Sequence, residues 1–415
     1  MRKLRIDSFT DKNRKMNWPA KRVVAPLLLC SSLSILLAVP STAQQTSIDD
    51  HRTTAIELEQ QGRNAEAEVA WRAVAAAQPN RAEPYAHLGF LEARQEHYSQ
   101  AIPLYRKALA LEPAMPGLKM NLGLALFKAG DLKEAVRIFE ALLKTEPPSS
   151  PEVRRLQTLV GMADYGLQRY AEAIPLLRQA TSDDPQNLPF RLILAHSCLA
   201  LKQYQCVLDV YHEILNLNAE SAEAEMLAGE ALDEMQDHAG AIQQFRAAVK
   251  ANPKEPNVHF GLGYLLWTQG QYAAAAQEFQ AELANLPDHV QALIYLADSD
   301  IKTGQSDLAL PLLHNAVRLK PDLEMAHLDL GIVYADTGRH GDAIRELKLA
   351  AKLNPDDVAP HWRMAQLYRT MGRKEEATME FEKTKTLTRA ADESVSSKLN
   401  QSQRARTHTD VPAQN

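Results

Sequence analysis

The chain has 415 residues, of which 45% are hydrophobic, 24% charged and only 6% aromatic, a globular composition that favours closely packed helices over sheet. The formal net charge of −6 conceals an asymmetry. Residues 1–43 carry eight Lys or Arg and two Asp, which leaves 38 basic and 50 acidic residues in the rest of the chain. Because an acidic domain repels phosphate backbones, we expect no nucleic-acid partner.

Residues 1–43 have the pattern of an export signal. A basic stretch ending at Arg22 precedes the apolar run of residues 23–39, and small residues follow it up to Ala43. We expect cleavage after Ala43. The alternative is an uncleaved membrane anchor, because the length of the apolar run is near the lower limit for spanning a bilayer. In both cases the positive-inside rule predicts that the remaining chain is exported, either periplasmic or extracellular, or tethered to the membrane by residues 23–39.

Prolines then recur at a nearly constant interval and divide the chain into repeats. The residue numbers of successive prolines differ by 34, 34, 38, 68, 34, 34 and 34, and the step of 68 is a double step with Ala219 at its middle. The prolines are Pro79, Pro113, Pro147, Pro185, Pro253, Pro287, Pro321 and Pro355. About ten repeats therefore fill residues 48–388, ending near residues 79, 113, 147, 185, 219, 253, 287, 321, 355 and 388. A period of this size predicts a solenoid.

Small and large residues alternate at fixed distances before each repeat end. At 24 positions before it stand only Gly or Ala, as at Gly331, and at 12 positions before it stands Ala in every repeat except the fifth, which has Val207. At eight positions before it stands a large side chain, such as Phe139 or Leu347. This alternation predicts two helices that cross at close range, with the large residue filling the space between them.

The turns of the repeat show a second regularity. Glycines at 17 positions before the repeat end can adopt the left-handed conformation that ends a first helix; they are Gly62, Gly130, Gly270, Gly304, Gly338 and Gly372. The proline then ends the second helix. We expect the polar residue directly after it, as at Asp288 or Asp356, to cap the next helix.

The pattern of Gly or Ala, then Ala, then an aromatic residue, then Pro in a helix-turn-helix of this period resembles the tetratricopeptide repeat (TPR). Tyr85 to Pro113, Ala222 to Pro253 and Glu324 to Pro355 show nearly all of it. The resemblance implies an all-α fold, a right-handed α-solenoid of about ten repeats. It also implies that the first helices line a concave groove which binds a peptide or a helix of a partner protein.

Three segments depart from the regular pattern. Four extra residues within residues 146–151, which contain three prolines, make this segment a candidate hinge. The fifth repeat is the most degenerate, with Ala219 in place of Pro and Lys202 where a turn glycine would stand. Residues 389–415 are polar, so we expect this tail to be partly disordered, although its first part can prolong the last helix and cap the solenoid.

The sequence contains no recognisable catalytic, metal-binding or cofactor-binding motif. His212 and Glu213 begin a zinc-protease motif, but Asn216 occupies the place of its second histidine. We also do not expect an enzyme with an attached repeat domain, because residues 1–43 and residues 389–415 are too few to fold a catalytic domain. Cys198 and Cys206 flank the turn of the fifth repeat, either as a disulfide or as two small buried thiols.

The resemblance projects a partner-binding groove onto two positions of each first helix, which precede the repeat end by 23 and by 20. The candidates are Phe90, Leu124, Phe127, Met162, Tyr165, Glu230, Asp233, Tyr264 and Trp267. Their order along the chain predicts a groove with apolar anchor residues on both sides of an acidic middle part, which would favour Lys or Arg in the partner. The alternative is that the aromatic residues only pack between adjacent repeats as framework. We therefore expect a non-enzymatic scaffold outside the cytoplasm, or alternatively a membrane-anchored assembly factor or co-chaperone of envelope, secretion or polysaccharide-export machinery.

Overall fold

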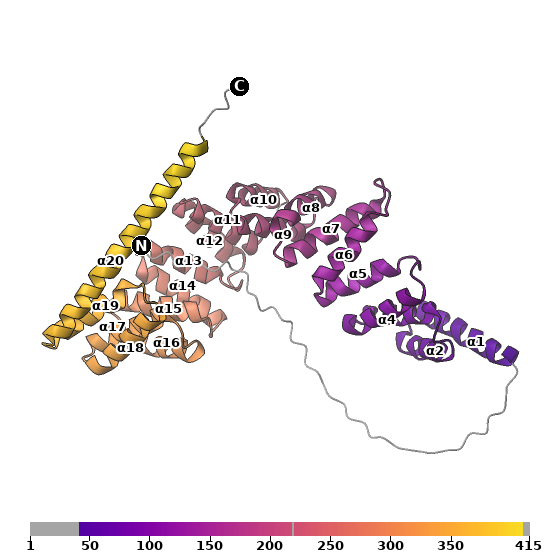
Figure 1. Ribbon diagram of the computed structural model, residues 1–415, viewed down its shortest axis with the longest axis horizontal. Helices are drawn as coiled ribbons and strands as arrows, with labels where there is room; N and C mark the ends of the chain where they lie inside the picture. Colours follow the sequence, from indigo (N-terminus) through magenta and orange to yellow (C-terminus); the bar gives the residue numbers. More distant parts are fainter. Residues whose placement is uncertain (1–40, 218–219, 410–415) are drawn as a thin grey trace, which may run out of the picture. The chain divides into compact units, whose positions relative to one another are not determined.

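The computed structural model describes residues 41–217 and 220–409, and within them the chain forms twenty helices and no strand (Figure 1). The helices are α1 (Ser41–Gln60), α2 (Asn64–Ala77), α3 (Ala82–Arg94), α4 (Tyr98–Leu111), α5 (Leu118–Ala129), α6 (Leu132–Leu143), α7 (Pro151–Gly166), α8 (Tyr170–Asp183), α9 (Leu188–Ala200), α10 (Tyr204–Asn216), α11 (Ala222–Glu234), α12 (His238–Ala251), α13 (Val258–Thr268), α14 (Tyr272–Asn285), α15 (Val290–Lys302), α16 (Ser306–Leu319), α17 (Glu324–Asp336), α18 (His340–Leu353), α19 (Val358–Thr370) and α20 (Lys374–Thr409).

The helices form two compact units, an N-terminal unit that ends at Val210 and a C-terminal unit that begins at Tyr211. Within each unit the two helices of a repeat pack on each other, and the second helix packs on the first helix of the next repeat. First helices of successive repeats also touch directly, as α11, α13, α15, α17 and α19 do in series. The all-α solenoid is confirmed, whereas its right-handed sense stays a prediction.

The predicted close crossing of the two helices is confirmed at the glycine column. A Cβ atom added to Gly89 would lie 2.7 Å from the ring of Tyr105, and one added to Gly331 would lie 2.6 Å from Cγ of Leu347. Gly123 would meet the ring of Phe139 in the same way. In each case the neighbour is the large residue 16 positions later in the same repeat. A small residue is therefore required at this position, because it leaves room for the large side chain of the second helix.

The inter-helix turn has the same backbone in all ten repeats. All six predicted turn glycines have a positive φ, between 73° and 86°. The four repeats without a glycine place Glu96, Gln168, Lys202 and Gln236 there, also with positive φ, between 59° and 69°. A non-glycine residue in this conformation costs roughly 1 kcal/mol. The fold thus requires the left-handed turn even in repeats that lack glycine, the residue that adopts this conformation without strain.

The expected capping residues are wrong by one position. Asp288 and Asp356 lie in the turn that follows the proline, and the caps are the next residues, His289 and Asp357. Nδ1 of His289 accepts from the backbone N–H of Ala292 at 3.0 Å. The proline and the residue after it form the two central positions of this turn, so neither is free to begin the helix.

The insertion before α7 does not divide the chain. Ser150 caps α7 by accepting a hydrogen bond from the backbone N–H of Glu152 at 3.2 Å, and α6 packs directly on α7. The division into units falls instead at Val210 in α10, inside the degenerate fifth repeat. Loss of consensus residues therefore marks the boundary better than the insertion does.

The last helix is longer than the sequence suggested. α20 continues to Thr409 (Figure 1, yellow), so the tail prolongs the last helix, while its partial disorder stays a prediction. Residues 374–409 contain neither Gly nor Pro, so nothing in them stops a helix. Within the described residues, no helix is long and apolar enough to cross a membrane. The segment of residues 1–40 lies outside the described residues, and residues 41–43 form the start of α1.

Candidate protein-binding surface

The candidate groove residues all lie on first helices, in two groups that belong to different units. Phe90, Leu124, Phe127, Met162 and Tyr165 lie in the N-terminal unit, and Glu230, Asp233, Tyr264 and Trp267 lie in the C-terminal unit. Every one of them keeps part of its surface accessible. First helices of successive repeats touch where α3 meets α5 and where α11 meets α13, and the candidate residues of each unit are called the stripe of that unit. The two stripes are described separately.

The stripe of the N-terminal unit is apolar. Phe90 is 42% exposed, and the guanidinium carbon of Arg94 lies 5.7 Å from its ring centroid. Leu124 and Phe127 pack their inner surfaces against the core. Leu124 also lines a cavity of about 490 Å³ between α5 and α7. This stripe offers apolar surface with one cation over it, and a recess into which a side chain can fit.

The stripe of the C-terminal unit is built on three aromatic rings. The rings of Tyr264 and Trp267 lie nearly parallel, with centroids 6.3 Å apart, and the ring of Tyr295 meets Trp267 edge-on at 5.0 Å. Nε1 of Trp267 donates a hydrogen bond to Asp298 at 2.7 Å. Because Tyr295 and Asp298 belong to the next repeat, Trp267 is partly framework between repeats. Its remaining accessible surface is still available to a partner.

Carboxylates lie beside this aromatic surface. α11 carries five acidic residues and no basic one. Burial, together with the nearby charges of Glu234 and Asp233, raises the pKa of Glu230 to about 8. Burial and the same two carboxylates also raise the pKa of Tyr264, whose helix α13 packs on α11. Glu230 is thus surrounded by protein while part of its surface stays accessible, as expected at the floor of a groove.

Sequence reasoning missed several residues of this surface. Asp298 holds the earlier of the two groove positions in the eighth repeat, which ends at Pro321, so the positional rule would have found it if it had been applied there. Tyr295 stands three positions earlier and gave no signal. A second recess of about 340 Å³ lies farther along the C-terminal unit, where Ile332 and Ala335 at the groove positions meet Arg363.

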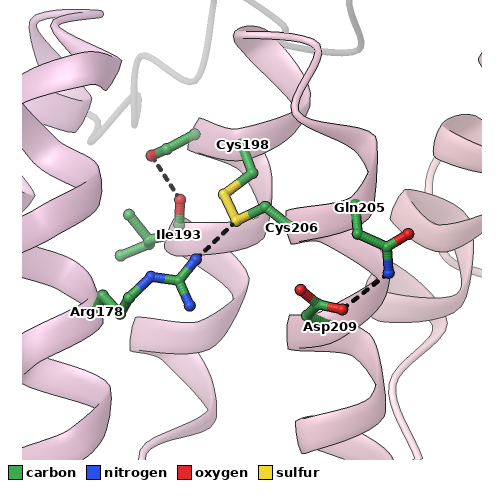
Figure 2. The surroundings of a disulfide bond; sticks show 7 residues. Arg178, Ile193, Cys198, Gln205, Cys206 and Asp209 are labelled. Atoms are coloured by element: carbon green, nitrogen blue, oxygen red, sulfur yellow. Dashed lines mark hydrogen bonds between the residues drawn. A yellow bond between two sulfur atoms is a disulfide. The ribbon is translucent and has the colours of Figure 1, made fainter.

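The two cysteines of the fifth repeat are joined in the structure (Figure 2). Their sulfur atoms are 2.06 Å apart and their Cα atoms 5.9 Å apart, a separation that a bridge spans without backbone movement. Nη2 of Arg178, from the preceding repeat, donates to Sγ of Cys206 at 3.2 Å. The bridge spans the left-handed turn at Lys202 and ties α9 to α10 in the repeat that has lost most consensus residues.

Comparisons with known proteins agree with this architecture. Models of the tetratricopeptide repeat match residues 92–160 and 165–229 and, separately, residues 211–290 and 295–358. Among curated relatives, the "Protein CTR9 homolog" of Arabidopsis thaliana is 22% identical over 60% of this chain and 24% of its own length. The "BBSome complex member BBS4" of Mus musculus is 25% identical over 47% of this chain and 44% of its own length. The chain therefore spans less than half the length of these two relatives.

Solved structures show similar repeats at low overall superposition. A structure of MamA from Desulfovibrio magneticus RS-1 is 21% identical, with a TM-score of 0.39, and covers 42% of this chain and 98% of its own. The matches of the two repeat models together extend over most of the ten repeats. The chain belongs to the tetratricopeptide-repeat family, whose members mediate protein–protein interactions.

Proposed function

We propose that this protein is a non-enzymatic scaffold whose first helices bind a segment of a partner protein, and that the C-terminal unit selects a segment rich in Lys or Arg. The observation that carries the proposal is the packing of α13, which carries Tyr264 and Trp267, on α11, which carries five acidic residues and no basic one. Aromatic faces and carboxylates both attract a cation, and the two attractions reinforce each other at one place.

Charge and contacts support a basic ligand over an acidic one. Glu230 makes no hydrogen bond or ion pair with another described residue, and its raised pKa shows that the unneutralised charge is unfavourable there. Asp233 is bound by Nδ1 of His238 at 2.7 Å, so the charge beside Glu230 is only partly balanced. A Lys or Arg of a partner would supply the missing positive charge in a partly desolvated site, where it is worth more than at an open surface.

The place of action is part of the same proposal. The basic and then apolar pattern of residues 1–39 supports export, and the scaffold would then serve the assembly of envelope, secretion or polysaccharide-export machinery, either free or as a membrane-anchored factor or co-chaperone. BBS4 is itself a member of a protein complex. Sequencing the N-terminus of the protein purified from its own cells separates the two forms, because a form cleaved after Ala43 begins at Gln44 and an anchored form retains residues 23–39.

The binding proposal is tested with two fluorescent twelve-residue peptides that differ only in carrying Lys or Glu at three positions. We expect the Lys peptide to bind the full chain and the Glu peptide to bind at least tenfold more weakly. Replacing Asp233 by Asn and Glu234 by Gln together should weaken binding of the Lys peptide about tenfold without lowering the melting temperature. The charge-matched control is Glu375→Gln with Glu382→Gln on exposed positions of α20. Equal binding of both peptides, or equal losses in both double variants, contradicts the proposal.

The pKa of Glu230 gives an independent prediction for stability. Its folded value of about 8 lies above the ordinary value of 4.5, so between these pH values the folded state holds a proton that the unfolded state has released. The free energy of unfolding should therefore fall as pH rises from about 4.5 to 8, by up to about 1.4 kcal/mol per pH unit from this group. In the variant Glu230→Gln, which has no carboxyl group to titrate, we expect this pH-dependent loss of stability to be absent.

Urea unfolding of the protein and of Glu230→Gln across this pH range measures the effect. We expect nearly equal stability at pH 4.5 and a growing advantage of the variant toward pH 8. Exposed Glu382→Gln serves as the control, with a difference that does not change with pH. A constant offset for Glu230→Gln at every pH would show that Glu230 is an ordinary surface carboxylate.

A further inference from the structure

The two sulfur atoms of the bridge in the fifth repeat have different surroundings. Cys198 on α9 is completely buried, whereas Cys206 on α10 is half-buried. The guanidinium group of Arg178, on α8, lies beside Cys206 and donates a hydrogen bond from Nη2 to its Sγ at 3.2 Å (Figure 2). One sulfur atom is therefore enclosed by protein, and the other lies near the surface next to a cation.

The chain contains a second pair of residues with the same spacing, in which a carboxylate takes the place of the sulfur. Arg106 on α4 and Glu134 on α6 are separated by 28 positions. The same separation holds for Arg178 and Cys206, and each pair has the same place in its two successive repeats. Nη2 of Arg106 donates to Oε2 of Glu134. This arginine position thus holds an anion elsewhere in the chain, and a thiolate of Cys206 would take the place of that anion here.

Arg178 is available to stabilise a thiolate when the two cysteines are reduced. It makes no ion pair with a carboxylate of the described residues. Asp209, on α10, accepts its hydrogen bond from Gln205 of the same helix, at 2.9 Å. A neighbouring cation favours the thiolate over the thiol, and the thiolate is the form that attacks a disulfide. Burial has the opposite effect on Cys198, so reduced Cys206 is the reactive thiol of the pair.

We infer that Cys206 is a modification site for a small-molecule disulfide, and that the modified residue then forms the bridge with Cys198. In the first step the thiolate of Cys206 attacks one sulfur of the donor, whose S–S bond breaks and releases one thiolate. In the second step Cys198 gives its proton to water and attacks Sγ of Cys206, which releases the other half of the donor as a thiolate. The two cysteines lose two electrons, and the donor disulfide is reduced to two thiols.

The burial of the two cysteines fixes the order of these steps and the size of the donor. Cys198 has no exposed surface, so a donor does not reach it while the fifth repeat is folded. It is in place for the second step, because the Cα atoms of the bridged pair are 5.9 Å apart. Half-buried Cys206 admits a small disulfide more readily than the active site of a folded oxidoreductase. None of these residues belongs to a stripe, so the inference is independent of the proposed binding function.

Pulse alkylation compares the two thiols within the unaltered sequence. The full chain is reduced with dithiothreitol, freed of the reductant and given a short pulse of iodoacetamide, and its tryptic peptides are analysed by mass spectrometry. Lys202 places the two cysteines on different peptides, and Cys30 falls on a third. We expect Cys206 to react about tenfold faster than Cys198 in the folded chain and at a similar rate in concentrated urea. Equal rates in the folded chain, or a faster reaction of Cys198, overturn the inference.

Glutathione disulfide is the probe for the modification itself. In the variant Cys198→Ser the second step is blocked, so a mixed disulfide with glutathione should accumulate at Cys206. In Cys206→Ser, modification of Cys198 should be about tenfold slower. No mixed disulfide at Cys206, or modification of Cys198 at the same rate, overturns the inference.

The role of the arginine is tested in the background of Cys198→Ser. Arg178→Gln should slow modification of Cys206 about fivefold, and Arg178→Lys, which keeps a cation, should restore most of the rate. Arg106→Gln removes the equivalent arginine beside Glu134 and should leave the rate unchanged. Equal rates in the Arg178→Gln and Arg106→Gln variants would contradict the stabilisation of the thiolate by Arg178.

Discussion

Replacing Gly331 by leucine is expected to lower the free energy of unfolding by about 3 kcal/mol or more, the cost that overpacked cores show. A Cβ at this position would lie 2.6 Å from Cγ and 2.7 Å from Cδ2 of Leu347, and a leucine adds three further carbon atoms in the same direction. The two helices of the ninth repeat would therefore have to separate. Thermal and urea unfolding measure the loss.

The matched control lies in the same repeat. A Cβ at Gly341, near the start of α18, would meet no atom within 4 Å, so Gly341→Leu should leave stability nearly unchanged or raise it through better helix propensity. Because repeat arrays can unfold in parts, amide hydrogen exchange of α17 and α18 should accompany the melting curves. Equal effects of the two substitutions would contradict the close crossing of these helices.

Replacing Glu282 by leucine is expected to destabilise the C-terminal unit by about 3 kcal/mol, because an unpaired buried donor costs about 1–3 kcal/mol. The substitution removes both oxygen acceptors, so the half-buried N–H of Asn257 and the buried N–H of Phe260 lose their partners. Leucine itself is not too large for this place, because Leu142 occupies it in the third repeat. The loss should appear as faster hydrogen exchange at the start of α13.

A glutamine at the same position separates charge from shape. Glu282→Gln keeps one acceptor oxygen and nearly the same volume, so it should lose less stability than Glu282→Leu. The order of stability Glu, Gln, Leu is the expected result. If the leucine variant were as stable as the natural protein, Glu282 would not cap α13.

Features that recur in every repeat could be predicted from the sequence. The glycine and alanine columns, the large residues between the helices and the turn glycines follow one steric requirement, and that requirement is repeated ten times. The same reasoning extends to Glu96, Gln168, Lys202 and Gln236, whose left-handed conformation is imposed by the fold against their own preference.

Polar contacts that only some repeats make could not be predicted in this way. His259, His327 and His361 each bind a glutamate on the second helix of their repeat, at 2.7, 2.8 and 2.6 Å. Such pairs become visible only once the packing of the two helices against each other is known. The bond from Glu282 to α13 likewise depends on a residue present in one repeat, where most of the other repeats have an apolar residue. Periodicity identifies the residues that all repeats share. The specific polar contacts are made by residues that differ from one repeat to another.

The candidate residues lie on first helices, and their role as a binding surface stays a prediction. The positional rule places residues on helices and gives no information on what adjoins them. It could not show that Trp267 is held by Asp298 of the next repeat, nor that the neighbours of Glu230 shift its pKa. Whether an aromatic residue is framework or anchor depends on contacts between repeats, which a single-repeat pattern does not contain.

The central claim is that the stripe on the first helices of the C-terminal unit, to which Tyr264 belongs, contacts a partner protein in the cell. A photo-crosslinking benzoylphenylalanine placed at Tyr264 tests it directly, with the same residue placed at Leu308, which is 52% exposed on a second helix, as the control. After irradiation of cells that express the full chain, the account predicts a defined crosslinked protein from position 264 and none from position 308. Crosslinks from position 308 alone, or identical crosslinks from both positions, would contradict it.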